Sequence, residues 1–277
     1  MIAIVGVGVL GTRVLKALSE YEEILLVDYD TVEEKNIRRQ YPPEAVGMKK
    51  VEAARRYMRG DARILHKHID WSTVGVLRDV EAVIDCTDNM LARYVINDYC
   101  SKHGIPWLHV GVSDTAGSVI AMLPSGPCYQ CIYPRGIGEA CTLALDLSVA
   151  DNTAKLAVAE LVRLRAEHQP RFIRITRDNN MVLAVNRRPG CPTCNGHYYY
   201  LQPRDYYITY CTSAGCMSAK PAKSHHHDAG MGEQIVVNGA NLVVYPNGEI
   251  HFKKIANDDV LHELAEIVYA NRFRKRS

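Results

Sequence analysis

The side chains of this sequence that are best suited to a specific chemistry are the thiols of two short cysteine pairs. Cys128 and Cys131 form the first C-x-x-C pair, and Cys191 and Cys194 form the second, further along the chain. Each pair places two thiolates one tight turn apart, and four thiolates together suit a tetrahedral zinc ion. The spacing therefore predicts a structural zinc site that joins two distant segments.

A glycine-rich loop near the N-terminus predicts a nucleotide site. Gly6, Gly8 and Gly11 fit the pattern G-x-G-x-x-G between an apolar segment and a helical pattern. Glycines let backbone amides approach a phosphate, and a helix N-terminus adds partial positive charge. Asp28 closes the next apolar segment, where an acidic side chain usually accepts hydrogen bonds from a ribose. A dehydrogenase that binds NAD would also fit these four residues.

The polar residues after Asp28 favour a triphosphate over a dinucleotide. Asn36, Arg39 and Gln40 come just after the expected ribose position, and Lys50 begins the next helix. Cations that converge beside a glycine loop suit a triphosphate whose leaving pyrophosphate must be neutralised. Hydride transfer makes no such demand.

A carboxylate after a further apolar segment completes the expected site. Asp88 follows the segment 82–84, at the carboxyl end of a strand, where ligands bind in doubly wound folds. A carboxylate in this place can hold Mg²⁺ against phosphate oxygens. Arg93 lies one helical turn further on and is expected to orient it.

The elements that must position these residues predict an α/β fold. Short, continuously apolar strands alternate with helical patterns, which is typical of a doubly wound, mostly parallel, Rossmann-like sheet. The segments 172–176 and 181–185 predict a hairpin that leads to the second cysteine pair. We expect the nucleotide-binding domain and its zinc site to occupy residues 1–200.

Residues 201–277 predict a small C-terminal α+β appendage. The expected elements are a hairpin within 242–255 and an amphipathic helix at 258–269. Cys211 and Cys216 also lie in this part of the chain, and a redox or sulfur-carrying role is left open for them.

Composition indicates where the protein works. The chain has 277 residues, 47% of them hydrophobic, and 9 cysteines. Met1 leads directly into an apolar strand pattern, so no signal peptide is predicted, and no run is long enough to span a membrane. We expect a cytoplasmic protein, in which paired cysteines are more often metal ligands than disulfides. A formal charge of +2 gives no argument for nucleic acid or a membrane as the main partner.

Taken in order, these motifs resemble those of the ubiquitin-activating-enzyme-like superfamily, the group of ThiF, MoeB and HesA. The chain carries G-x-G-x-x-G, D-x-D-x-V with N-x-x-R-Q, G-x-x-K-V-E-A-A, D-C-T-D-N and two C-x-x-C pairs within residues 1–197. The resemblance implies an ATP-dependent enzyme that adenylylates the C-terminal glycine of a small β-grasp protein, either a sulfur carrier or a ubiquitin-like modifier. It also implies Mg²⁺ as a cofactor and zinc as a structural metal.

The resemblance assigns roles to individual residues. By this resemblance Asp28 binds the ribose and Asp88 holds Mg²⁺. The phosphates are contacted by Asn36, Arg39 and Lys50, and the four paired cysteines are structural zinc ligands.

Cys141, in the segment after the first cysteine pair, has two interpretations. In the resembling family a cysteine at this location can take the activated acyl group as a thioester, or exchange a persulfide. It can equally be an ordinary loop cysteine, because several family members work by adenylation alone.

Two other functions stay open within the same superfamily. One is an ATP-using enzyme that acts on a small molecule, a peptide or a tRNA base. The other is a non-catalytic scaffold. Family members usually carry helices before the first strand, whereas this sequence starts at that strand, and this difference counts in favour of a scaffold. A homodimer is also left open.

Overall fold

The chain forms two compact units in the computed structural model, one from Met1–Ile132 with Thr142–Leu201 and one mainly from Gln202–Ser277. The structure describes residues 1–18, 23–37, 39–58, 60–113, 116–134, 146–167, 169–203, 206–211, 216–221, 231–246, 248–252 and 263–269. Among these residues, no helix has the length and apolar character needed to cross a membrane.

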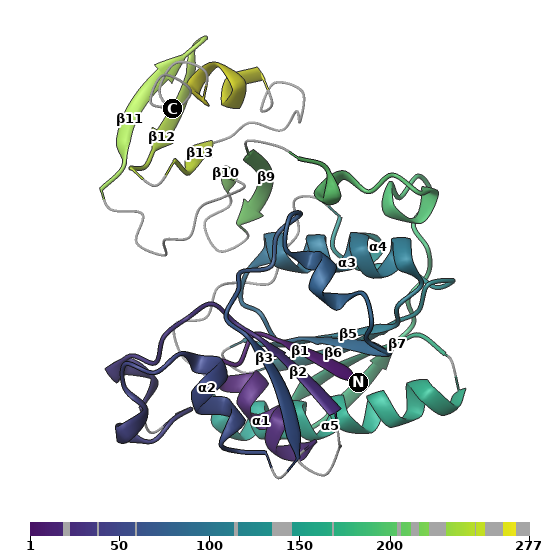
Figure 1. Ribbon diagram of the computed structural model, residues 1–277. Helices are drawn as coiled ribbons and strands as arrows, with labels where there is room; N and C mark the ends of the chain where they lie inside the picture. The colour runs from purple at the N-terminus through teal and green to yellow at the C-terminus, as the bar shows by residue number, and fades with distance from the viewer. Residues whose placement is uncertain are drawn as a thin grey trace. The chain divides into compact units, whose positions relative to one another are not determined.

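An eight-stranded sheet forms the centre of the first unit, in the order β3-β2-β1-β4-β5-β6-β7-β8 (Figure 1). The strands from β3 to β5 pair in parallel, and β5 to β8 pair antiparallel. The predicted mostly parallel α/β sheet is therefore confirmed, and so is the hairpin before the second cysteine pair. The strands are β1 (Ile2–Val5), β2 (Glu23–Val27), β3 (Asp61–Leu65), β4 (Ala82–Asp85), β5 (Trp107–Val112), β6 (Ala116–Met122), β7 (Arg171–Thr176) and β8 (Asn180–Leu183).

Helices cover both faces of this sheet. Helices α1 and α5 lie on one face, and α3 and α4 lie on the other (Figure 1). Every residue of β1 and β4 is buried, as expected of central parallel strands that are covered on both sides. The α-helices are α1 (Val9–Ala17), α2 (Lys50–Arg55), α3 (Met90–His103), α4 (Tyr129–Ile132) and α5 (Leu147–Glu167). The short 3-10 helices are η1 (Glu34–Asn36), η2 (Pro43–Ala45), η3 (Val74–Leu77), η4 (Thr193–Asn195) and η5 (Tyr199–Leu201).

The second unit is an antiparallel sheet with the order β11-β12-β13-β10-β9. Residues 263–269 are helical, and their buried side chains join those of the sheet in one core. The expected hairpin at 242–255 corresponds to β12 and β13. The expected helix is present over 263–269, and its residues 258–262 lie outside the described part of the chain. The strands are β9 (Tyr206–Cys211), β10 (Cys216–Pro221), β11 (Glu233–Val237), β12 (Ala240–Val244) and β13 (Ile250–Phe252).

This second sheet is larger than the sequence analysis predicts, since β9, β10 and β11 are added to the expected hairpin. A turn between β11 and β12 supplies the missed signal. Asn238 has φ 49° and Gly239 has φ 79°, the left-handed backbone that an Asn-Gly pair adopts readily in a two-residue hairpin turn.

Candidate active site and metal centre

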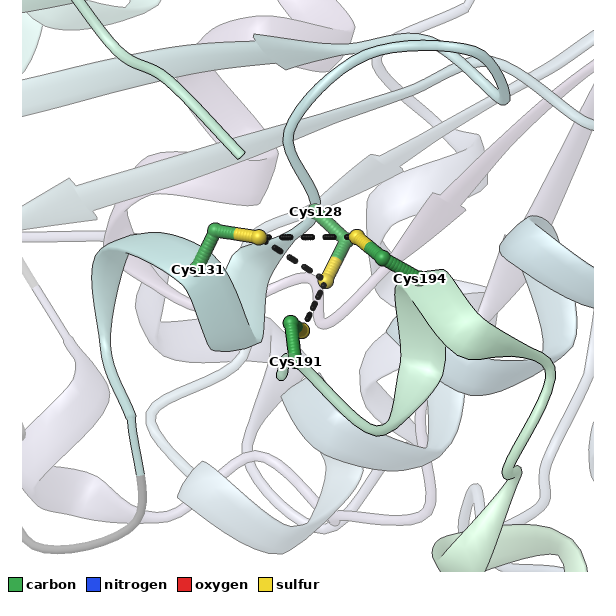
Figure 2. Close-up of side chains that lie close together, drawn as sticks. All are labelled: Cys128, Cys131, Cys191 and Cys194. Carbon is green, nitrogen blue, oxygen red and sulfur yellow. Dashed lines mark hydrogen bonds between the residues drawn. The ribbon is translucent and has the colours of Figure 1, made fainter. Parts of the chain in front are cut away.

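The four predicted metal ligands converge in the first unit. Sγ of Cys128 lies 3.5 Å from that of Cys191 and 3.9 Å from that of Cys131, whose Sγ lies 3.4 Å from that of Cys194 (Figure 2). All four sulfurs lie within 4.8 Å of one another. A tetrahedral zinc ion with Zn–S bonds of about 2.3 Å needs sulfurs roughly 3.8 Å apart. The cluster therefore has the size and the donor set of a zinc site.

The thiols of this cluster share their protons unequally. The pKa of Cys131 falls to about 4, mainly because the thiol of Cys128 donates to its sulfur, with backbone hydrogen bonds of Arg188 and Cys128 adding to the effect. The same contact, together with burial, raises the pKa of Cys128. A thiolate is thus available in the cluster at neutral pH, and the thiolate is the form that binds zinc.

Helix α3 holds both cysteine pairs through two fully buried polar residues. Oδ1 of Asn97 accepts a hydrogen bond of 2.7 Å from the backbone N–H of Tyr129, which lies inside the first pair. Oδ1 of Asp98 accepts one of 2.6 Å from the hydroxyl of Thr193, which lies inside the second. Oδ2 of Asp98 accepts a third from the N–H of Tyr200 at 2.9 Å. Neither Asn97 nor Asp98 was predicted from the sequence, because a polar side chain in a helix gives no local sign of partners so far along the chain.

The glycine loop joins β1 to α1 with almost no space for side chains. Gly6 has φ +83°, and a Cβ placed on it would lie 2.9 Å from the carbonyl oxygen of Cys86. A Cβ on Gly11 would lie 1.9 Å from the carbonyl oxygen of Gly6. Gly8 differs, because a Cβ there would meet no atom within 4 Å, and Gly8 is the residue at the N-cap of α1. The loop therefore leaves space at a helix N-terminus, where backbone N–H groups bind phosphate.

Asp28, at the end of β2, ties that strand to the glycine loop. Its Oδ2 accepts a hydrogen bond of 2.7 Å from the N–H of Val7, and its Oδ1 accepts one of 2.8 Å from the N–H of Asp30. Burial raises the pKa of Asp28, an effect that the charge of Lys50 and the two hydrogen bonds oppose. Nζ of Lys50 lies 2.6 Å from Oδ2 of Asp30, so this lysine already has a carboxylate partner in the site.

The residues expected near the phosphates shape a loop after β2. Asn36 is buried, and its Oδ1 accepts the backbone N–H of Glu33 at 2.9 Å. Arg39 is exposed, and its carbonyl oxygen accepts a hydrogen bond from Arg13 at 3.1 Å. The buried Oε1 of Gln40 has no hydrogen-bond partner within the described part of the chain. A buried acceptor in this state fits a ligand that donates a hydrogen bond.

Arg13, on α1, is a second residue that the sequence analysis missed. Its guanidinium donates to the carbonyl oxygens of Val9 and Arg39 and lies 2.6 Å from a carboxylate oxygen of Asp151, on α5. It thereby connects the loop that carries Arg39 with the helix that begins at the glycine loop. Arginine at a helical position is too common for this role to be predicted from sequence.

Asp88 is exposed on a turn that its neighbours brace from two sides. Oδ1 of Asp85 accepts hydrogen bonds from both the N–H and the hydroxyl of Thr87, at 3.0 and 2.6 Å. The Arg93 guanidinium donates to the carbonyl oxygen of Thr87, with Nη2 at 2.7 Å. Asn89 then caps α3 by accepting the N–H groups of its first turn. Arg93 therefore acts on this turn through Thr87, and the exposed Asp88 oxygens suit Mg²⁺, which prefers carboxylate and water ligands.

Sheet order brings these separate motifs to one edge. The glycine loop follows β1, Asp28 follows β2 and Asp88 follows β4, and these strands are parallel neighbours in the order β2-β1-β4. Burial, with the charges of Asp30, Asp88 and Asp28, raises the pKa of Tyr29, so one tyrosine senses all three carboxylates. Ligands of doubly wound folds bind at this reversal of strand order.

Cys86 and Cys100 are free thiols of the first unit. Burial raises the pKa of Cys86 and of Cys100, which keeps both thiols protonated and unreactive. Cys141 lies outside the described residues. Cys211 and Cys216 occupy facing register positions of β9 and β10 in the second unit.

A doubly wound sheet with a glycine loop at its switch point is typical of the class of nucleotide-binding α/β proteins, and the four thiols beside helix α3 could hold a metal ion. The model of the ThiF family matches residues 1–193. The chain therefore belongs to the ThiF family, which confirms the resemblance found in its motifs.

Curated relatives are activating enzymes and adenylyltransferases by name. The SAMP-activating enzyme E1 of Haloferax volcanii is 34% identical over 144 residues, which cover 48% of this chain and 53% of that protein. The adenylyltransferase and sulfurtransferase MOCS3 of Aedes aegypti is 26% identical over 302 residues, covering 98% and 64%. The ubiquitin-like modifier-activating enzyme 5 of Oryza sativa is 33% identical over 158 residues, covering 48% and 38%. The chain thus spans about half the length of the Haloferax volcanii protein.

Solved structures share the fold. E. coli MccB with ATP gives a TM-score of 0.59 at 21% identity, over 70% of this chain and 66% of MccB. MccB with succinimide gives a TM-score of 0.61 at 20% identity, over 70% and 65%.

Proposed function

We propose that this protein is an adenylyltransferase that uses ATP to activate the C-terminal glycine of a small ubiquitin-like or sulfur-carrier β-grasp protein. The observation that carries the proposal is the convergence of the glycine loop, Asp28, Lys50 and Asp88 at the switch point of the sheet. Membership of the ThiF family and the names of the relatives support the same reaction. The shared fold with MccB, solved with ATP, agrees with it.

The proposed reaction needs positioning and charge stabilisation more than a general base. A carboxylate oxygen of the carrier attacks the α-phosphorus of ATP, the new P–O bond gives an acyl adenylate, and pyrophosphate leaves with the electron pair of the broken bond. The N–H groups at the start of α1, near Gly8, bind phosphate oxygens. Arg39 and Lys50 neutralise the negative charge that grows on the leaving group.

Two residues of the proposed site hold the remaining groups. Asp28 accepts hydrogen bonds from the ribose, since each of its oxygens keeps a second lone pair beyond the backbone contacts shown here. Asp88 would hold Mg²⁺, which would supply the positive charge that lowers the cost of bringing two anions together. The zinc ligands have a structural role, because the segments that carry them are attached to helix α3 by hydrogen bonds to Asn97 and Asp98.

A pyrophosphate-exchange assay tests the proposal. Purified sulfur-carrier and ubiquitin-like proteins that end in Gly-Gly are incubated with the enzyme, ATP and labelled pyrophosphate, and label enters ATP only when the adenylate forms reversibly. The same carriers without their last two residues are the control. Exchange should be lost in Asp88→Asn and kept in Asp79→Asn, a matched change at an exposed carboxylate. ATP binding without exchange for every carrier would refute the proposed function.

We also propose a second step at Cys141. Its thiolate attacks the carbonyl carbon of the acyl adenylate, a C–S bond forms, and AMP leaves. Cys141→Ala should keep pyrophosphate exchange and lose a carrier–enzyme adduct that dithiothreitol cleaves. An adduct that persists in this variant would place the covalent step at another residue, and a wild-type enzyme without any adduct would limit the reaction to adenylation.

A further inference from the structure

A buried histidine–carboxylate pair lies directly behind the turn that presents Asp88. His109, on β5, and Asp85, on β4, are register partners of two parallel strands, and both are 0% exposed. Their side chains meet, with Nδ1 of His109 at 2.9 Å from Oδ2 of Asp85. The proposed reaction gives neither residue a direct role.

The carboxylate of Asp85 is divided between two tasks. Its Oδ1 accepts the N–H and the hydroxyl of Thr87 and so folds the turn before Asp88. Its Oδ2 faces His109 Nδ1, while Nε of Arg93 lies further away, at 4.0 Å. The hydrogen bond from His109 therefore opposes rotation of the carboxylate toward the arginine, and that rotation would remove Oδ1 from Thr87.

The histidine ring is itself held by the metal centre. The ring of Tyr129 contacts that of His109 edge to face, with centroids 5.1 Å apart and an interplanar angle of 65°. Tyr129 is 0% exposed, lies between Cys128 and Cys131, and has its N–H bound by Asn97. Packing from the first cysteine pair thus helps to fix the imidazole, and the imidazole fixes Asp85.

We propose that His109 is a positioning residue for the magnesium–nucleotide complex, which it orders through Asp85 and the Thr87 turn that carries Asp88. The inference rests on the proposed function of Asp88 as the Mg²⁺ ligand. Loss of the His109 donor lets the Asp85 carboxylate rotate, and the turn then holds Asp88 less well. The effect falls mainly on Mg²⁺, because the N–H groups of Gly6 and Val7 donate to Val27 and Asp28 and not to Asp85 or His109.

Calorimetric titration of ATP, in buffer with Mg²⁺ and in magnesium-free buffer, measures this effect. The quantity compared is the gain in ATP affinity that Mg²⁺ provides. In His109→Leu this gain should fall by about tenfold, while the affinity for ATP without Mg²⁺ stays at the wild-type value. His103→Leu, the same change at an exposed histidine of α3, should leave both affinities unchanged.

Two further variants test the donor itself and serve if His109→Leu does not fold. The amide nitrogen of asparagine falls where Nδ1 of histidine lies, so His109→Asn should retain the gain. The amide of His109→Gln lies further out and should not. An equal Mg²⁺-dependent gain in the Asn and Gln variants would overturn the inference. So would an equal fall in ATP affinity with and without Mg²⁺, which would indicate general structural damage.

The same titrations separate this inference from the proposed function. If the gain in ATP affinity from Mg²⁺ falls in His109→Leu but the wild type adenylylates no carrier, only the proposed adenylylation is refuted. A wild-type protein that exchanges pyrophosphate with a carrier, but whose Mg²⁺ gain is unaffected in His109→Leu, would refute only the role of His109.

Discussion

The carboxylate of Asp98 accepts a hydrogen bond of 2.6 Å from the hydroxyl of Thr193, between residues that lie 95 positions apart in the chain. Asp98 is 0% exposed and Thr193 is 2% exposed, so this bond is shielded from water. It joins the middle of α3 to the second cysteine pair, and the N-terminus of α3 begins next to Asp88. The cysteine cluster and the proposed nucleotide site thus share one helix.

Removal of that hydroxyl should cost stability. Thr193→Val keeps the shape of the side chain and removes the hydroxyl that donates the shortest hydrogen bond to Oδ1 of Asp98. A hydrogen bond to a charged group contributes about 1.5–3 kcal/mol, so the free energy of unfolding should fall by roughly that amount. Urea unfolding of the zinc-loaded protein measures it. Thr31→Val, at an exposed threonine, is the matched control, and equal effects of the two changes would contradict a special role for Thr193.

Chelation of zinc should loosen the protein locally before it unfolds. Without the metal, the hydrogen bonds that Asn97 and Asp98 accept still attach both cysteine pairs to α3. Amide hydrogen exchange should therefore speed up first around Tyr129 and Thr193 and then in α3, with β1 and α1 still protected. Zinc added back should restore the slow exchange. Simultaneous loss of protection in all of these elements would show that the metal supports the entire fold.

Lys50 and Asp30 give a prediction about competition inside the proposed nucleotide site. Their side chains are 2.6 Å apart, so a phosphate must share the lysine with Asp30. Lys50→Met should weaken ATP binding by roughly 10–150-fold, the equivalent of one charge-assisted hydrogen bond. Asp30→Asn removes the competing charge and should bind ATP at least as tightly as the wild type. A loss of similar size in both variants, measured by calorimetry, would show that the ion pair itself forms the site.

The N-terminal sheet could be predicted because its central strands are covered on both faces and form unbroken apolar runs. The edge strand β11 has no such run, and the short Asn238-Gly239 turn was the signal available for it. In the site, the glycine loop, Asp28 and Asp88 could be placed because parallel strands end at the same edge of a sheet. Side chains that act through partners far away in the chain could not be placed from the sequence.

His109 and Asp98 show the limit of such predictions. The hydrogen-bond partner of His109 lies 24 positions earlier in the chain, and the partners of Asp98 lie about a hundred positions later. A histidine in an apolar strand and an aspartate in a helix have no local pattern that indicates these contacts. Only the register of β4 with β5, and the return of the chain at η4, brings the groups together.

Asp28 gives a prediction about pH because burial raises its pKa above the ordinary value of 3.8. The folded protein then holds a proton on Asp28 at pH values where the unfolded chain has lost it. The stability from this proton is complete below the ordinary pKa and is lost as the pH rises through the raised one. The Asp28→Asn variant has no carboxyl group to titrate at this position. The difference between its free energy of unfolding and that of the wild type should therefore become more positive as the pH rises from about 4 to 7.

Urea unfolding of both proteins across that range measures the difference, in which acid release of zinc, common to both, cancels. The variant keeps one side-chain acceptor for the N–H groups of Val7 and Asp30, so a constant loss of stability at all pH values is also expected. The slope against pH, not this offset, carries the prediction. A relative stability that declines with rising pH would mean that the Val7 and Asp30 hydrogen bonds, with Lys50, outweigh burial and lower the pKa of Asp28.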